Sequence, residues 1–201
     1  MYVDYEGMPA QAKQMRETGK SLNQELLQAY ASIGDMHKSW YGKRYNALVE
    51  QFNNLIPQLN QMLTTVAYEV PVNLEKIANN YSQADKGQNC TTVVDEKPTS
   101  IANLSMPNDV GMHFVESEVE EVKNKVSNNF RNAKERMNEF GTQYEKIRWE
   151  NSAAAEEFKV QFEKLKSTII SAFDQIEADF KSLMNQTQQD MQNVESANTV
   201  K

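Results

Sequence analysis

Apolar side chains recur along most of the chain at alternating spacings of three and four residues. Four segments carry this spacing, and they run from Met15 to Trp40, from Tyr45 to Tyr81, from Val115 to Ile147 and from Phe158 to Leu183. The positions between the apolar ones are mostly polar, so each segment carries one narrow apolar stripe. Such a stripe is typical of a long amphipathic helix packed beside others at a shallow angle. The pattern therefore predicts an all-α protein with four long helices.

Two prolines lie inside the second segment, beside the stripe and not on it. They are Pro57, between two stripe positions, and Pro71, directly after another. Proline lacks a backbone N–H and crowds the preceding turn of a helix. We therefore expect bends at both positions and no end to the helix.

Within each half of the chain, a short break follows a tryptophan and separates the two helical segments. The breaks read SWYGKRY and RWENSAAAEEF, with Gly42 and Asn151 two residues after Trp40 and Trp149. Glycine and asparagine are the residues that best tolerate a positive φ at a helix end. We therefore predict that the small residue makes the turn and that the tryptophan closes the apolar stripe against water. Ser152 is the expected N-cap of the last helix.

Residues 86–109 differ from the rest of the chain. The segment KGQNCTTVVDEKPTSIANLSMPND has two prolines, many small polar residues and no helical period, and we interpret it as a linker. It separates a helical hairpin at 1–85 from a second hairpin at 110–201.

The length of this linker bears on how the hairpins pack. If their turns lie at opposite ends, the linker must travel most of a helix of ~60 Å. Its 24 residues reach at most ~80 Å, so this antiparallel packing is feasible. A slack linker would also allow two chains to exchange hairpins, which leaves both a monomer and a swapped dimer open.

Composition and charge exclude several classes of function. The net charge of −7 argues against a nucleic-acid partner, which would need a basic face, and disfavours adhesion to anionic lipid. No run of apolar residues approaches the length that spans a bilayer, so we expect no stable membrane insertion. The N-terminus, MYVDYEGMPAQAK, has acidic residues and lacks the apolar core of a cleavable signal peptide. These features predict a soluble protein.

Few residues in the sequence are candidates for catalysis or for binding a metal or cofactor. His37 and His113 lie far apart in the sequence, and Cys90 is the only cysteine, without a basic neighbour to activate it. We find no glycine-rich phosphate loop and no nucleophile with an accompanying base. We therefore expect no enzymatic activity, no cofactor and no metal site.

The first hairpin resembles a known family at two motifs. A helical hairpin of this size with Trp-x-Gly at its turn is similar to the WXG family of type VII (ESX) secretion substrates. The second hallmark of that family, Tyr-x-x-x-Asp/Glu beyond the second helix, is matched by YSQAD at residues 81–85. The resemblance covers residues 8–85 and, more loosely, 110–195. In the second hairpin, WEN at 149–151 lacks the glycine, and no Tyr-x-x-x-Asp/Glu follows.

The resemblance implies a tandem of two WXG-like hairpins, the second one degenerate, packed as an antiparallel four-helix bundle like the dimers of the family. Trp40 and Gly42, with Trp149 and Asn151 in the second half, would form the hairpin-turn motifs. Their primary role is then structural.

The resemblance also implies a route out of the cell. Tyr81 and Asp85 are four residues apart and can share one face of a helix. By analogy with the family, they form part of an export signal that an FtsK/SpoIIIE-type membrane ATPase of the type VII apparatus reads. We therefore expect a non-enzymatic substrate of a Gram-positive bacterium, secreted or held at the cell surface without a cleavable signal peptide. It would travel alone, as a homodimer or with a co-secreted helical partner.

Other functions stay open at this point. The same helical surface would suit a cytoplasmic adaptor that escorts a toxin to the type VII apparatus. A plain coiled-coil structural protein would need neither Tyr81 nor Asp85. Amphipathic helices can also rearrange on lipid, which leaves a lipid-active role open.

Overall fold

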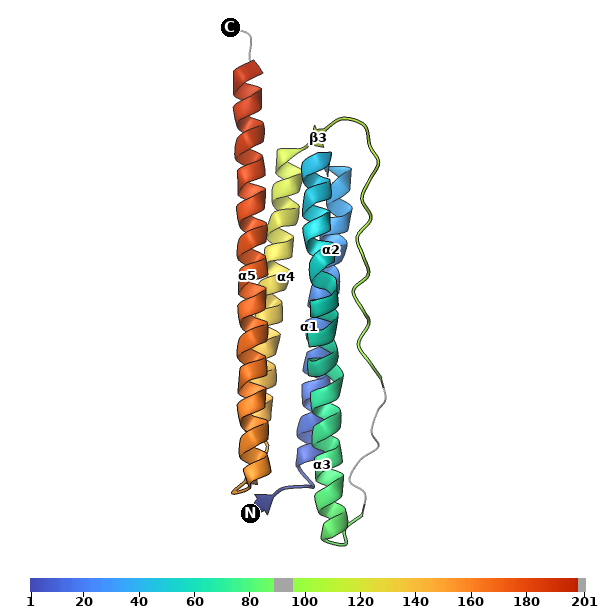
Figure 1. Cartoon of the computed structure of the whole chain (residues 1–201), viewed down its shortest axis with the longest axis vertical. Coiled ribbons are helices and arrows are strands. Elements are labelled where there is room, and N and C mark those ends of the chain that lie inside the picture. Colours follow the sequence, from blue (N-terminus) through green and yellow to red (C-terminus); the bar gives the residue numbers. More distant parts are fainter. Residues whose placement is uncertain (89–95, 199–201) are drawn as a thin grey trace.

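The computed structural model describes residues 1–88 and 96–198; Cys90 lies outside them. Long helices lie side by side over most of its length (Figure 1). The elements in chain order are β1 (Tyr2–Val3), α1 (Met8–Asp35), the 3₁₀ turn η1 (Met36–Lys38), β2 (Trp40–Tyr41), α2 (Lys43–Thr64), the π-helical turn η2 (Thr65–Glu69), α3 (Val70–Ala84), β3 (His113–Phe114), α4 (Glu116–Glu145), β4 (Trp149–Glu150) and α5 (Ala153–Asn198). The predicted all-α fold of helical hairpins in a bundle is confirmed.

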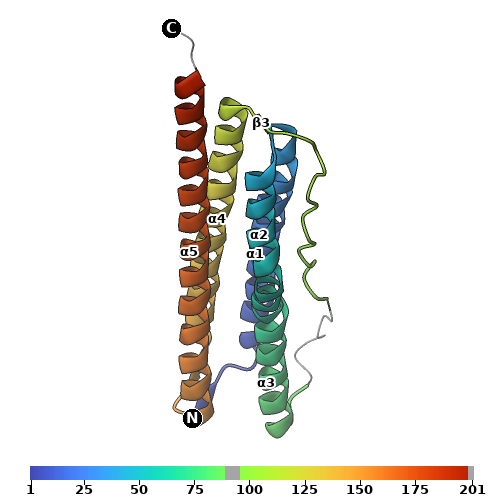
Figure 2. The same cartoon turned by 45° about the horizontal axis from the view of Figure 1, so that its top comes forward.

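The two hairpins point in opposite directions along the bundle. The first consists of α1 and the continuous rod α2–η2–α3, and the second consists of α4 and α5. The turn of the first hairpin lies beside β3 at one end, and the turn of the second lies near the N-terminus at the other end (Figures 1 and 2). The hairpins are therefore antiparallel, as expected.

Each hairpin turn is tied to the strand that precedes the first helix of the other hairpin. β1 pairs with β4, where Val3 lies opposite Trp149, and β2 pairs with β3, where Phe114 lies opposite Trp40. Both pairs are antiparallel, so the hairpins hold each other in the same way at both ends. Sequence analysis missed these strands because two-residue strands are too short to show a period-two pattern.

The apolar stripes merge into one core that runs along the bundle. Every residue of the four predicted stripes is buried or half-buried, which confirms the helical pattern. The core also contains a charge pair that the sequence did not indicate. Arg16 on α1 and Glu75 on α3 meet at 2.7 Å, with side chains 5% and 3% exposed. Burial of such a pair is tolerated because each charge neutralises the other.

Neither proline ends the rod of the first hairpin. Pro57 lies inside α2, and Pro71 occupies the first turn of α3, directly after η2. A π turn shifts the hydrogen-bond pattern at the point where proline cannot donate. At this turn α1 comes very close, because a Cβ on Gly19 would lie 2.6 Å from the Cα of Ala67. Glycine therefore allows the two helices to touch here.

Part of the expected linker has a defined path. Residues 96–112, here called the strap, run extended along α1 and α2 (Figures 1 and 2). Ile101 in the strap is only 3% exposed, and Asn53 and Asn60 of α2 bind the strap backbone. The described part of the connection is therefore packed on the first hairpin rather than slack.

Candidate functional site

Tyr81 and Asp85 lie where the end of the first hairpin meets the turn of the second. The ring of Tyr81 lies edge-on to the indole of Trp149, with centroids 6.3 Å apart. The Tyr81 hydroxyl is 3.6 Å from the sulfur of Met1. Asp85 accepts a hydrogen bond of 2.7 Å from the hydroxyl of Tyr5. We call these five residues the motif cluster; they come from three segments far apart in the sequence.

The end of α3 positions the motif. Lys86 has φ of 57°, and the N–H groups of Lys86 and Gly87 donate to the carbonyl oxygens of Gln83 and Ser82. This is the pattern of a Schellman motif, which ends a helix at a defined residue. Asp85 is therefore held in the last turn, one turn after Tyr81.

The two motif residues differ in exposure. Asp85 is exposed, whereas Tyr81 is half-buried under Trp149 and Met1. An acidic residue at a helix C-terminus opposes the helix dipole, so helix stability does not account for Asp85. The pair therefore presents a carboxylate and the accessible part of a tyrosine ring at one end of the bundle.

The turn of the second hairpin has the predicted positive φ, but the prediction that Asn151 ends a helix is wrong, because α4 ends at Glu145 and Trp149 and Glu150 form β4 before it. Asn151 has φ of 57°, and Ser152 caps α5 by accepting the N–H of Ala155 at 3.1 Å. Trp149 is half-buried and packs on Phe158, with centroids 6.0 Å apart. Its indole Nε1 is buried and has no hydrogen-bond partner among the described residues.

A pocket of about 500 Å³ opens beside this tryptophan, between α3 and α5. Its lining includes Ile77, Tyr81, Trp149 and Phe158. The motif tyrosine therefore forms part of an aromatic hollow to which both hairpins contribute. The hollow could not be predicted from the sequence, because it exists only once the hairpins are docked.

The turn of the first hairpin, at the other end, is closed. Trp40 is 1% exposed and lies edge-on to Tyr45 and Phe114, at centroid distances of 5.6 and 5.9 Å. Gly42 has φ of 126°, as its predicted role requires. The prediction that it ends the first helix is wrong, however, because Trp40 and Tyr41 form β2 and Gly42 is the N-cap of α2.

A buried tyrosine packs behind each turn. Burial raises the pKa of Tyr45, near Trp40, to about 12, with a smaller contribution from the negative charge of Asp35. Burial also raises the pKa of Tyr144, whose ring stacks on Phe162 in the other half of the bundle, to about 12. A buried tyrosine therefore lies behind each turn, and the two ends differ in how far the tryptophan itself is covered.

Neither a metal centre nor a membrane span is evident in the described ranges. Within 1–88 and 96–198, the side chains form no group of three or more candidate metal ligands. No helix in these ranges is both long enough and apolar enough to cross a membrane.

Comparison with known proteins identifies the first hairpin. Neither a curated protein nor a solved structure matches the chain. Residues 1–86 match the family model WXG100, described as proteins of 100 residues with WXG. This family comprises small helical proteins associated with type VII secretion. The match includes the turn at Trp40 and the motif at Tyr81 and Asp85, and it stops before the strap. The first hairpin, which makes up less than half of the chain, is therefore similar to proteins of the WXG100 family.

Proposed function

We propose that this protein is a non-enzymatic substrate of a type VII secretion system and that Tyr81 and Asp85 form part of its export signal. The observation that carries the proposal is the contact between Tyr81 and Trp149, a centroid distance of 6.3 Å. It places the turn of the second hairpin directly against the motif of the first. Asp85 is exposed beside them, and its carboxylate, which accepts a hydrogen bond from Tyr5, has room to meet a cation on a partner as well.

The second hairpin acts in this proposal as a covalently attached partner. It carries a degenerate turn, Trp149 and Asn151, and lacks its own Tyr-x-x-x-Asp/Glu. The matching strand pairs, β1 with β4 and β2 with β3, support a tandem in which each half closes the other. One signal then serves both halves, and the protein leaves the cell as a folded unit.

The partner proposed for this surface is the FtsK/SpoIIIE-type membrane ATPase of the type VII apparatus. Recognition depends on Tyr81, Asp85 and Trp149 being held together by the docked hairpins. Unfolded protein would separate these three residues, so recognition favours the folded chain. The destination is the culture medium or the cell surface.

A secretion assay in the native host tests the proposal. Tyr81→Ala and Asp85→Ala should each retain the protein inside the cell, and Tyr81→Phe, which keeps the ring, should lose less export. Asp109→Ala serves as the matched control, because Asp109 is an exposed acid in the strap, far from the motif in sequence. Circular dichroism should show that all four variants stay folded. Undiminished secretion of both Tyr81→Ala and Asp85→Ala would refute the proposal.

An escort role is the second candidate. It is favoured by an open apolar groove between α2 and α5, which leaves part of the bundle unpartnered. In that case the chain stays in the cell and brings a larger toxin to the same apparatus. A pull-down that recovers one stoichiometric large protein, while the culture medium stays free of the chain, would favour the escort over the substrate.

A further inference from the structure

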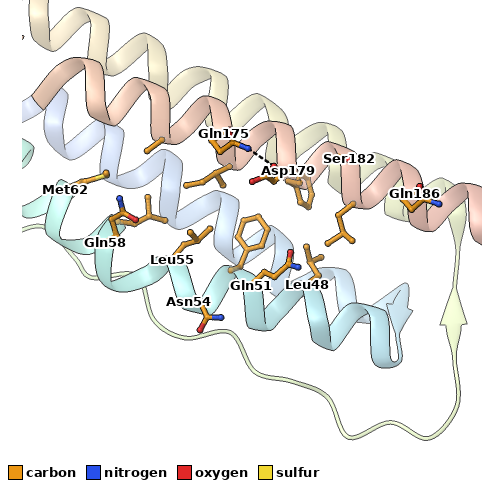
Figure 3. A pocket seen from close by; sticks show the side chains of 16 residues that line it. Leu48, Gln51, Asn54, Leu55, Gln58, Met62, Gln175, Asp179, Ser182 and Gln186 are labelled. Atoms are coloured by element: carbon orange, nitrogen blue, oxygen red, sulfur yellow. Dashed lines mark hydrogen bonds between the residues drawn. The ribbon is translucent and has the colours of Figure 1, made fainter. Parts of the chain in front are cut away.

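A long groove separates α2 from α5 (Figure 3). Its volume is about 840 Å³, within the range of about 300–1,000 Å³ of ligand pockets. At its floor the rings of Phe52 and Phe180 meet edge-on at 5.7 Å. The walls include Leu48, Leu55, Met62, Ile176 and Leu183. The groove therefore offers a continuous apolar track with helical walls on both sides.

The polar residues along this groove are mostly uncharged amides. Gln51 and Gln58 line it from α2, and Gln175 and Gln186 line it from α5 (Figure 3). The single acidic residue in the lining, Asp179, accepts a hydrogen bond of 2.8 Å from Gln175. Gln51 and Gln58 are exposed, and the hydrogen bonds of the described residues leave both side chains without a protein partner. Their amides are therefore available to a ligand.

The other side of α2 shows what such amides can hold. Asn60 donates to the carbonyl of Ile101 at 3.0 Å and accepts the N–H of the same residue at 2.8 Å. Asn53 does the same with Leu104, at 3.0 and 2.7 Å. Each asparagine therefore pairs with both backbone groups of one strap residue, much as a neighbouring strand would.

The spacing of these contacts follows from the rise per residue of a helix and of an extended chain. Asn53 and Asn60 are seven residues apart, and seven helical residues rise ~10.5 Å. Ile101 and Leu104 are three residues apart, and three extended residues span ~10 Å. Amides at every seventh position of a helix therefore match every third residue of an extended chain. The side chain of Ile101, which is 3% exposed, fills the gap beside α2 at the same time.

A third asparagine shows that these side chains pair with the backbone of the strap. Asn46, seven residues before Asn53, donates to the carbonyl of Pro107 at 3.4 Å. Its own Oδ1 is buried without a partner, because proline has no N–H to donate. The asparagine ladder, which is Asn46, Asn53 and Asn60, therefore keeps its seven-residue spacing even where the strap supplies only half of the pairing.

Gln51 and Gln58 repeat this seven-residue spacing on the side of α2 that faces α5. We propose that the α2/α5 groove binds an extended segment of a partner polypeptide in the way that α1 and α2 hold the strap. Gln51 and Gln58 pair with the backbone of residues three apart, and the apolar side chains of those residues enter the groove. The partner segment is uncharged or weakly basic, given the amides, Asp179 and the net charge of −7.

An extended segment fits this groove better than a helix. A helix satisfies its backbone N–H and C=O groups internally, so it makes no use of a row of amides. An extended chain must find partners for those groups, and two amides at the matching interval supply them. The proposal concerns the purified protein and does not depend on export, so it and the secretion hypothesis can fail separately.

Fluorescence polarisation with a labelled peptide tests the proposal. The probe is KPTSIANLSMPN, residues 97–108 of this chain, which is extended with a three-residue repeat on the asparagine ladder. The ladder of the full-length protein is already occupied by its own strap, at an effective concentration of the order of millimolar. Saturable binding at micromolar peptide therefore reports another site, and we expect it at the α2/α5 groove.

Variants locate the binding. The double variant Gln51→Ala with Gln58→Ala should weaken binding about tenfold, because two backbone pairings are lost. Gln61→Ala, an exposed glutamine on the same helix outside the groove, should leave affinity unchanged. The double variant Asn53→Ala with Asn60→Ala should still bind the peptide. If it did not, the peptide would be bound at the asparagine ladder and not at the α2/α5 groove.

Other outcomes would overturn the proposal. Equal affinity for the glutamine double variant would remove the amides from the mechanism. An amphipathic helical peptide that binds more tightly than the probe would assign the groove to a helix. Concentration-dependent dimers that a Leu55→Asp change abolishes would assign it to a second copy of the chain. No binding of the probe at up to about 1 mM would leave the groove without this ligand.

Discussion

Trp40 and Trp149 occupy equivalent places in the two hairpin turns but are covered to different extents. Both lie in a two-residue antiparallel strand pair, and both are followed two residues later by a residue with positive φ. Trp40 is 1% exposed, whereas Trp149 is half-buried. The residue opposite each tryptophan also differs. Phe114 is paired with Trp40 and its ring lies edge-on to that indole, whereas Val3 is paired with Trp149. A phenyl ring can cover more of an indole than a valine side chain can.

The same backbone arrangement therefore occurs in two different packing environments. At the first turn the tryptophan seals the core, and its contacts are with other buried rings. At the second turn the same arrangement leaves one indole face available to Tyr81 and to the pocket between α3 and α5. The opposing residue is Phe114 at the closed end and Val3 at the more open end. The proposed signal therefore lies at the end that is less tightly packed.

Removal of the two indoles should have the largest effect on the free energy of unfolding, and the effect should differ most between the two ends. Trp40→Ala should lower the free energy of unfolding by about 3–5 kcal/mol, because it empties a fully buried site. Trp149→Ala should cost about 1–2 kcal/mol, since that ring is only half-buried. Denaturant unfolding followed by circular dichroism measures both. Export should show the opposite order among variants that remain folded, with Trp149→Ala secreted less than a mildly destabilised control such as Trp40→Phe.

Substitution of the two turn residues, Gly42 and Asn151, should lower the free energy of unfolding by amounts that differ less than those for the two tryptophans. Gly42 has φ of 126°, where side chains are strained, and an added Cβ would lie 3.3 Å from the carbonyl oxygen of Gly111. Gly42→Ala should therefore cost about 1–3 kcal/mol. Asn151, at φ of 57°, lies in the left-handed region that asparagine tolerates, so Asn151→Ala should cost about 1 kcal/mol. Equal losses in a denaturant titration would contradict this account.

Sequence reasoning predicted those features that depend on neighbours along the chain. The apolar stripes, the positive φ values of Gly42 and Asn151 and the cap at Ser152 are confirmed. Each follows from a spacing or a residue type within a few positions. The exposure of Trp149 could not be predicted in this way, because neighbours such as Val3 and Tyr81 are distant in sequence and meet it only after the hairpins dock.

The strap shows a signal that was present but was not used. Residues 96–112 lack a helical period, but Ile101, Leu104 and Pro107 recur at every third position. The asparagine ladder recurs at every seventh position of the second helical segment, off its apolar stripe. Neither period has meaning alone, because the match appears only when a helix and an extended chain are laid side by side. The buried pair of Arg16 and Glu75 was hidden for the same reason, since each charge is paired only across two helices.

Covering Trp149 should abolish the difference between the two ends. Val3→Phe places at the second end the kind of ring that seals the first, and it should raise the free energy of unfolding by about 0.5–1 kcal/mol. Acrylamide should then quench less of the tryptophan emission, because neither indole is open. Tyr2→Phe is the matched control, since Tyr2 is adjacent on β1, faces Glu150 and is 44% exposed.

The same change separates stability from recognition. If the open indole serves the export signal, Val3→Phe should make the protein more stable and less efficiently secreted, while Tyr2→Phe leaves both unchanged. A loss of stability could explain reduced export in most variants, but here the two quantities move in opposite directions. Normal secretion of a Val3→Phe protein whose indole is shown to be shielded would remove Trp149 from the signal and leave Tyr81 and Asp85 to act without it.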